Sequence, residues 1–116
     1  MTMMASTPNQ TPVFTPEMRS FFLALDRKIN EANTSGKSVM VGTCWEQAAS
    51  ELTEGPVRFA LEDSYKRMCR GESDSFYQML KQHHTHLFPA DVLEELRHGE
   101  DVGDFEISMR AIAEKR

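Results

Sequence analysis

The stretch from Gly71 to Gly103, GESDSFYQMLKQHHTHLFPADVLEELRHGEDVG, decides the fold because helix stops and starts alternate through it. Gly71 follows an apolar-periodic segment, and glycine readily adopts the left-handed conformation that ends a helix. Ser73 or Asp74 is the expected N-cap of the next helix, since short polar side chains accept hydrogen bonds from free amides. The face that we expect this helix to bury carries Phe76, Met79, Leu80 and His83.

The second part of the stretch predicts a corner and two more helices. Phe88-Pro89 turns the chain, because proline is favoured where a new helix begins. Gly99 is the expected end of the fifth helix, and Gly99 and Gly103 bracket a tight turn. Asp104 then lies in the first turn of a sixth helix, where a negative charge suits the helix dipole. The inward positions of these two helices are Val92, Leu93 and Leu96, then Phe105, Met109 and Ile112.

The N-terminal half supplies three earlier helices. Residues 1–15 carry no charged side chain, and they are predicted to form a flexible leader from which Val13 and Phe14 dock on the domain. Thr15 and Pro16 open a first helix that runs to about Ala32. Its buried face comprises Met18, Phe21, Phe22, Leu25 and Ile29, which recur at three- and four-residue spacing.

Two further helices lead up to Gly71. Ser38 is the expected cap of a second helix over about Val39–Leu52, and Pro56 begins a third that ends near Arg70. No segment alternates as a strand would. The sequence therefore predicts an all-α fold, a six-helix bundle of short antiparallel helices over residues 16–116.

Composition excludes several classes of function. Residues 1–70 carry eight acidic and eight basic side chains, whereas residues 71–116 carry ten acidic and five basic ones. No basic stripe is present to neutralise phosphates, so we expect no nucleic-acid partner. No apolar run reaches the roughly 18 residues that a membrane span requires. Cys44 and Cys69 both fall on apolar faces and are predicted to be packed free thiols.

The candidate chemical groups are weak signals. His83 and His86 lie three residues apart, but a metal site needs three or four ligands, and His98 would have to fold back to join them. Adjacent carboxylates such as Glu94/Glu95 and Glu100/Asp101 diverge on a helix and are expected to form a solvated face. Gly36-Lys37-Ser38 lacks the first glycine and the preceding strand of a phosphate-binding loop. We predict no enzyme, no cofactor and no metal, with a histidine metal enzyme as the least favoured alternative.

The spacing of these breaks resembles the cytoplasmic repeat of the inner-membrane platform proteins of type II secretion and type IV pilus systems. The matching elements are Gly71-Glu72-Ser73, His84 with Phe88-Pro89, Gly99-Glu100-Asp101-Val102-Gly103, and the helix from Ile107 to Ala113. The resemblance covers about Leu61 to Lys115, and it continues more weakly over Met18 to Ala60. The polar connection from Asn33 to Ser38 is longer than the family's usual turn.

The resemblance implies a domain without catalysis that couples an assembly ATPase to pilus or pseudopilus biogenesis. It implies Gly71, Glu72, Phe88, Pro89, Gly99, Glu100 and Gly103 as the family-motif residues, with an architectural or interface role. The expected partners are the assembly ATPase and other inner-membrane components, and a homodimer is compatible with the family. The expected location is the cytoplasmic face of the bacterial inner membrane, as the first domain of a longer membrane protein. The alternative is a free-standing soluble helical adaptor or regulator that binds the same machinery.

Overall fold

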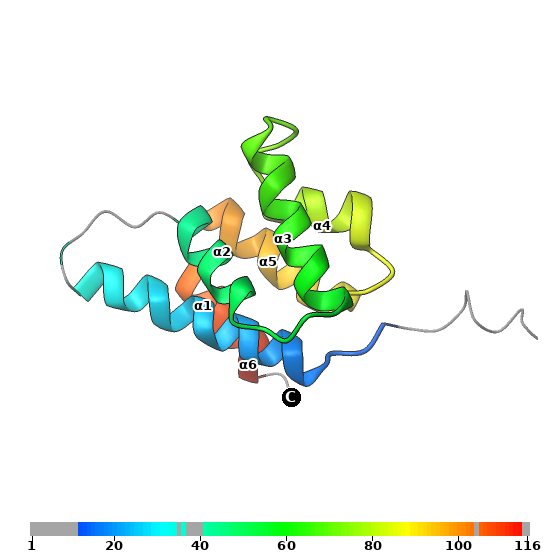
Figure 1. Ribbon diagram of the computed structural model, residues 1–116. Helices are drawn as coiled ribbons and strands as arrows, with labels where there is room; N and C mark the ends of the chain where they lie inside the picture. The colour runs from blue at the N-terminus through cyan, green and yellow to red at the C-terminus, as the bar shows by residue number, and fades with distance from the viewer. Residues whose placement is uncertain (1–11, 35, 37–40, 104, 115–116) are drawn as a thin grey trace, which may run out of the picture.

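The computed structural model describes residues 12–34, 36, 41–103 and 105–114 of the 116-residue chain. These residues form helices joined by short connections, and no strand occurs among them (Figure 1). The helices are α1 (Pro16–Thr34), α2 (Val41–Ser50), α3 (Pro56–Cys69), α4 (Phe76–His84), α5 (Ala90–Val102) and α6 (Phe105–Glu114). The predicted all-α helical bundle is therefore confirmed.

Each helix packs against the next one along the chain, and the last helix returns to the first. The most extensive contacts join α1 to α6 and α5 to α6. In Figure 1, α1 runs along the lower side of the molecule with α6 beside it, while α3 and α4 lie above. The six helices thus form a closed circuit around one core. Across the described residues, no helix is both long enough and apolar enough to span a bilayer.

The centre of the core is an aromatic cluster around Trp45. The indole ring stacks on Phe76 with ring centroids 3.9 Å apart, and it meets Phe21 edge-on at 4.8 Å. Its Nε1–H donates to the carbonyl oxygen of Leu61 at 3.0 Å, so the one polar atom of the ring is paired despite complete burial. The cluster joins α1, α2, α3 and α4.

The entrance to α4 differs from the expectation. The N-cap is Ser75, whose Oγ accepts from the backbone N–H of Gln78 at 3.1 Å, and neither Ser73 nor Asp74 holds that position. Ser73 Oγ instead accepts from the backbone N–H of Ser75 at 3.0 Å. The two serines therefore accept from the backbone N–H groups of Ser75 and Gln78 at this entrance. The first helical residue is Phe76, whose ring stacks on Trp45.

The prediction that Gly99 ends the fifth helix is wrong. α5 continues to Val102, and Gly103 is the residue that turns left-handed, with φ 74° and its N–H donating to the carbonyl of Gly99. A single glycine inside a helix costs only about 1 kcal/mol, so packing overrides the local signal at the buried Gly99. Gly71, with φ 85°, does follow the C-cap of α3 as predicted.

Several smaller expectations also changed. α1 extends to Thr34, where Thr34 Oγ1 donates to the carbonyl of Asn30 at 2.8 Å, and α2 ends at Ser50, before the expected Leu52. The expected start of α2 at Val39 lies outside the described residues. Phe14 is buried in the core as predicted, but Val13 is 68% exposed and does not dock. The expected roles of Ser38 and Asp104 fall outside the described residues.

The two cysteines occupy different environments. Cys44 is buried on the inner face of α2, as predicted, and its burial raises the pKa of the thiol. Cys69 is exposed at the C-terminal end of α3, so the prediction that it is packed is wrong. The last turn of α3 lies at the edge of the core, where Met68 is only partly buried, so apolar spacing does not guarantee burial there.

Candidate functional site

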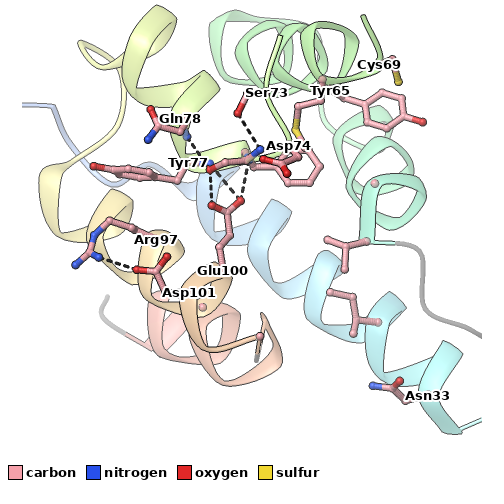
Figure 2. Close-up of a pocket in the computed structure, with 18 residues that line it drawn as sticks. Asn33, Tyr65, Cys69, Ser73, Asp74, Tyr77, Gln78, Arg97, Glu100 and Asp101 are labelled. Atoms are coloured by element: carbon pink, nitrogen blue, oxygen red, sulfur yellow. Dashed lines mark hydrogen bonds and ion pairs between the residues drawn. The ribbon is translucent and has the colours of Figure 1, made fainter. Parts of the chain in front are cut away.

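A groove of about 1070 Å³ lies on the surface of the described residues. The N-terminal end of α4 and the C-terminal end of α5 form one side of it. The ends of α1 and α3 and the start of α2 form the other side (Figure 2). The lining includes apolar side chains, which are Ile29, Val41, Met68 and Phe76, together with Tyr65, Tyr77, Cys69 and a set of polar and charged residues.

Glu100 lies at the centre of this groove and joins α5 to the start of α4. Its Oε1 accepts from the hydroxyl of Ser75 at 2.6 Å, and its Oε2 accepts from the backbone N–H groups of Phe76 at 2.7 Å and Tyr77 at 3.4 Å. The first amides of a helix have no partner within the helix, and they carry the positive end of its dipole. A carboxylate from 25 residues along the chain thus caps α4.

The environment of Glu100 shifts the pKa of its carboxyl group. Burial raises the pKa of this carboxyl, and the hydrogen bonds from Ser75, Phe76 and Tyr77 oppose the rise without cancelling it. The expectation of a solvated Glu100/Asp101 pair is therefore wrong for Glu100. It holds for Asp101, which is exposed, because adjacent residues on a helix point in different directions.

Arg97 is the one cationic side chain among the described residues that line the groove. Its guanidinium bonds the carboxylate of Asp101 at 2.8 Å and that of Glu94 at 2.8 Å. These are exposed pairs at helical spacing, and such pairs contribute little stability individually. Their consequence for the site is that the guanidinium is already engaged.

The opposite rim carries Tyr65 and Cys69. A hydrogen bond with Cys69 raises the pKa of the Tyr65 hydroxyl, and the nearby charge of Glu46 adds to this effect. Gly42 lies so close to the Tyr65 ring that a Cβ there would approach the ring carbon to 3.2 Å. The absence of a side chain at residue 42 therefore lets α2 pass close to the groove wall.

The expected motif residues divide into three groups in space. Gly99, Glu100 and Gly103 line the groove. Gly71 and Glu72 lie at the connection after α3, where hydrogen bonds from Arg67 at 3.0 Å and Arg70 at 3.2 Å lower the pKa of Glu72. Phe88 and Pro89 are buried at the corner between α4 and α5, away from the groove.

The histidines do not assemble into a metal site in the part of the chain that the structure describes, where no group of three or more potential ligands could hold an ion. His84, and not His83 as expected, is buried against the bundle. Its Nε2 lies 2.8 Å from Asp63 Oδ2, and because a carboxylate only accepts, Nε2 carries the hydrogen. His86 and His98 are exposed.

Asp63 joins α3 to α4 through that contact. Burial acts to raise the pKa of Asp63, but hydrogen bonds from Arg67 at 2.8 Å and from His84 together lower it below its ordinary value. No motif or spacing along the chain singles out Asp63. Ser75 could have been recognised, because Ser75 and Gln78 have the spacing of a capping box ahead of an apolar helix.

No family model, no curated protein and no solved structure matches this chain. The resemblance to the platform proteins therefore rests on the spacing of the motif residues alone, and it stays a prediction.

Proposed function

We propose that this chain is a non-enzymatic interaction domain of the inner-membrane platform type, which couples an assembly ATPase to pilus or pseudopilus biogenesis. The observation that supports this proposal most directly is the position of the Gly99–Gly103 motif. Its glutamate caps α4 and its last glycine ends α5, so the motif holds two helix ends in a fixed relation. A motif used in this way stabilises the packing of the helices and takes no part in catalysis.

The chemistry at Glu100 also favours a role without catalysis. A shifted carboxyl in a groove is a candidate general acid or base, but such a group needs an oxygen within hydrogen-bond reach of a substrate. Both Glu100 oxygens already accept hydrogen bonds from this chain. Removing them from those donors would leave the start of α4 uncapped, and this cost opposes participation in proton transfer.

The closed circuit of helices suits a domain that transmits movement between partners. Every helix contacts its sequence neighbours, and α1 contacts α6, so displacement of one element is passed to the others through packed side chains. This property supports a coupling role at the cytoplasmic face of the inner membrane, with other components of the machine or a second copy of the domain as further partners.

The proposal is tested by co-purification with an assembly ATPase of a type II secretion or type IV pilus system from the same organism. Retention of the ATPase on the immobilised domain, at a defined stoichiometry, is the expected result. Absence of retention at micromolar concentrations of both proteins contradicts the proposal. Sequencing beyond the codon for Arg116 distinguishes a domain of a platform protein from a free-standing adaptor. A platform protein predicts apolar spans of about 20 residues and a second copy of the glycine motif, whereas an adaptor predicts a stop codon.

A further inference from the structure

We propose that the groove between α3 and the α4–α5 pair is the docking site for a basic amphipathic helix of a partner protein. This inference rests on the proposed function in taking the ligand to be a protein segment. The chemistry of that segment follows from the charges, the apolar surface and the size of the groove.

Groups that would attract an anion are already occupied at this groove. The first amides of α4 point at the carboxylate of Glu100, with the Phe76 N–H at 2.7 Å from Oε2. The guanidinium of Arg97 is held by Asp101 and Glu94. An incoming phosphate or carboxylate would have to displace carboxylates of this chain from both places, so an acidic ligand is disfavoured.

The remaining charge is negative. The described lining carries three carboxylates, Asp74, Glu100 and Asp101, against the single guanidinium of Arg97. Because Arg97 is paired with Asp101 at 2.8 Å, the excess negative charge of the lining is that of Asp74 and Glu100. Asp74 and Asp101 are exposed on either side of the central Glu100 (Figure 2). Carboxylates spaced along a groove favour a ligand with several positive charges, and they speed its approach.

The apolar part of the lining indicates what the other face of the ligand should be. Val41, Tyr65 and Met68 pack on the core but are only partly buried, so they present apolar surface to the groove. Burying such surface under leucine or similar side chains stabilises a complex by about 25 cal/mol per Å². An apolar floor with charged sides matches helix-in-groove recognition.

The size of the groove admits a peptide segment. Its volume of about 1070 Å³ lies at the top of the range of roughly 300–1,000 Å³ for small-molecule sites. A helix of two or three turns can lie along such a groove with its basic side chains directed to Asp74 and Asp101.

A designed probe tests this site directly. The probe is an amidated peptide of about 14 residues made of leucine and lysine, with leucine at i, i+3, i+4 and i+7, a length near the minimum for an isolated helix. Added to the ¹⁵N-labelled domain, it should shift the amide signals of Tyr65, Met68, Asp74 and Gln78. The same peptide with glutamate in place of lysine should cause no saturable shifts.

Charge-reversal variants locate the binding. The double variant Asp74→Lys/Asp101→Lys should lower the affinity for the leucine–lysine peptide by about fivefold or more, because each exposed charge pair contributes up to about 1 kcal/mol. Glu54→Lys makes the matched control, since Glu54 is exposed in the α2–α3 connection and does not line the groove. Far-UV circular dichroism verifies that all variants are folded.

Cys69 provides a second, independent test. This exposed thiol lines the groove, whereas Cys44 is buried, so a bulky maleimide can be attached at Cys69 selectively. The adduct should abolish the peptide-induced shifts. Iodoacetamide, which adds a much smaller group, should reduce binding less.

The docking site is overturned by unchanged affinity in the double variant, by equal binding of the glutamate peptide, by shifts centred outside the groove or by no saturable shift at millimolar peptide. Failure of the proposed function has a different signature. If the lysine peptide binds in the groove but the ATPase is not retained, the docking site stands and the platform role fails. If the ATPase is retained equally by the double variant, the platform role stands and the groove is not its contact.

Discussion

At the scale of single residues, Glu100 connects α5 to the start of α4, which lies about 25 residues earlier in the chain. One carboxylate satisfies a hydroxyl and two backbone amides of α4 while belonging to α5. An unpaired buried donor costs as much as a lost hydrogen bond, so the start of α4 depends on a side chain outside its own helix.

Replacing Glu100 with alanine should therefore destabilise the domain. We expect Glu100→Ala to lower the free energy of unfolding by about 1–3 kcal/mol, because the N–H of Phe76 and the hydroxyl of Ser75 lose their partner. Urea denaturation measures the change. Asp101→Ala is the matched control, and because its ion pair is exposed, it should cost about 1 kcal/mol or less. Equal effects of the two variants would contradict the capping role of Glu100.

Asp63 should make part of the stability depend on pH. The pKa of Asp63 is lower in the folded protein than in the unfolded chain, so its contribution is present at neutral pH and is lost as pH falls through the folded value. We expect Asp63→Asn to cost about 1–3 kcal/mol at pH 7, where hydrogen bonds between charged groups are intact.

The pH series supplies the decisive comparison for Asp63. The difference between wild type and Asp63→Asn should shrink below about pH 4, as the wild-type carboxyl becomes protonated. Urea midpoints measured at intervals from pH 7 to pH 3 give the profile. A difference that stays constant over this range would show that the charge of Asp63 has no part in its contribution.

At the scale of elements, the corner between α4 and α5 is set by buried apolar side chains. Phe88 is 1% exposed, and it packs in the core just before Pro89 starts the next helix. Neither Phe88 nor Pro89 lines the groove. Phe88 and Pro89 thus belong to the apolar core, whereas Glu100 lines the groove.

Truncating Phe88 tests how much its buried ring contributes to stability. Phe88→Ala should lower the free energy of unfolding by about 3–5 kcal/mol, since it removes a fully buried ring and leaves a cavity. His86→Ala, at an exposed position in the same connection, should change stability by less than about 0.5 kcal/mol. Thermal melting followed by circular dichroism compares the two variants. A small effect of Phe88→Ala would mean that the corner can collapse around the lost ring.

Helix number, most helix faces and the end of α3 at Gly71 were predictable from the sequence, whereas the cap of α4, the end of α5 and the groove were not. The recurrence of Met18, Phe21, Phe22, Leu25 and Ile29 predicted the buried face of α1, and all five are buried. The prediction that α5 ends at Gly99 was wrong because packing can override a local helix-stop signal. Capping of Ser75 and Phe76 by Glu100 depends on how α5 packs beside α4, and spacing along the chain carries no information about such a contact.

At the scale of the whole molecule, the contact between α1 and α6 closes the bundle. Met109 and Ile112 of α6 are completely buried, and α1 shares its most extensive interface with this helix. Helices that complete a core contribute to cooperative unfolding as well as to local packing.

Removing α6 should therefore affect the whole domain. A chain ending at Gly103 should lose its cooperative thermal transition and bind the dye ANS, because the faces of α1 and α5 that pack on α6 become exposed. Glu114→Ala, at an exposed position of α6, should melt as wild type. A sharp transition in the shortened chain would show instead that α1 to α5 fold without α6.

The position of Trp45 has a practical consequence for every one of these measurements. The chain contains one tryptophan, and its indole is enclosed by rings from α1 and α4 while bonded to a carbonyl of α3. Its fluorescence emission should therefore be blue-shifted in the native state and move to longer wavelength when water reaches the ring. A single intrinsic chromophore at the meeting point of four helices reports the integrity of the domain without any added label.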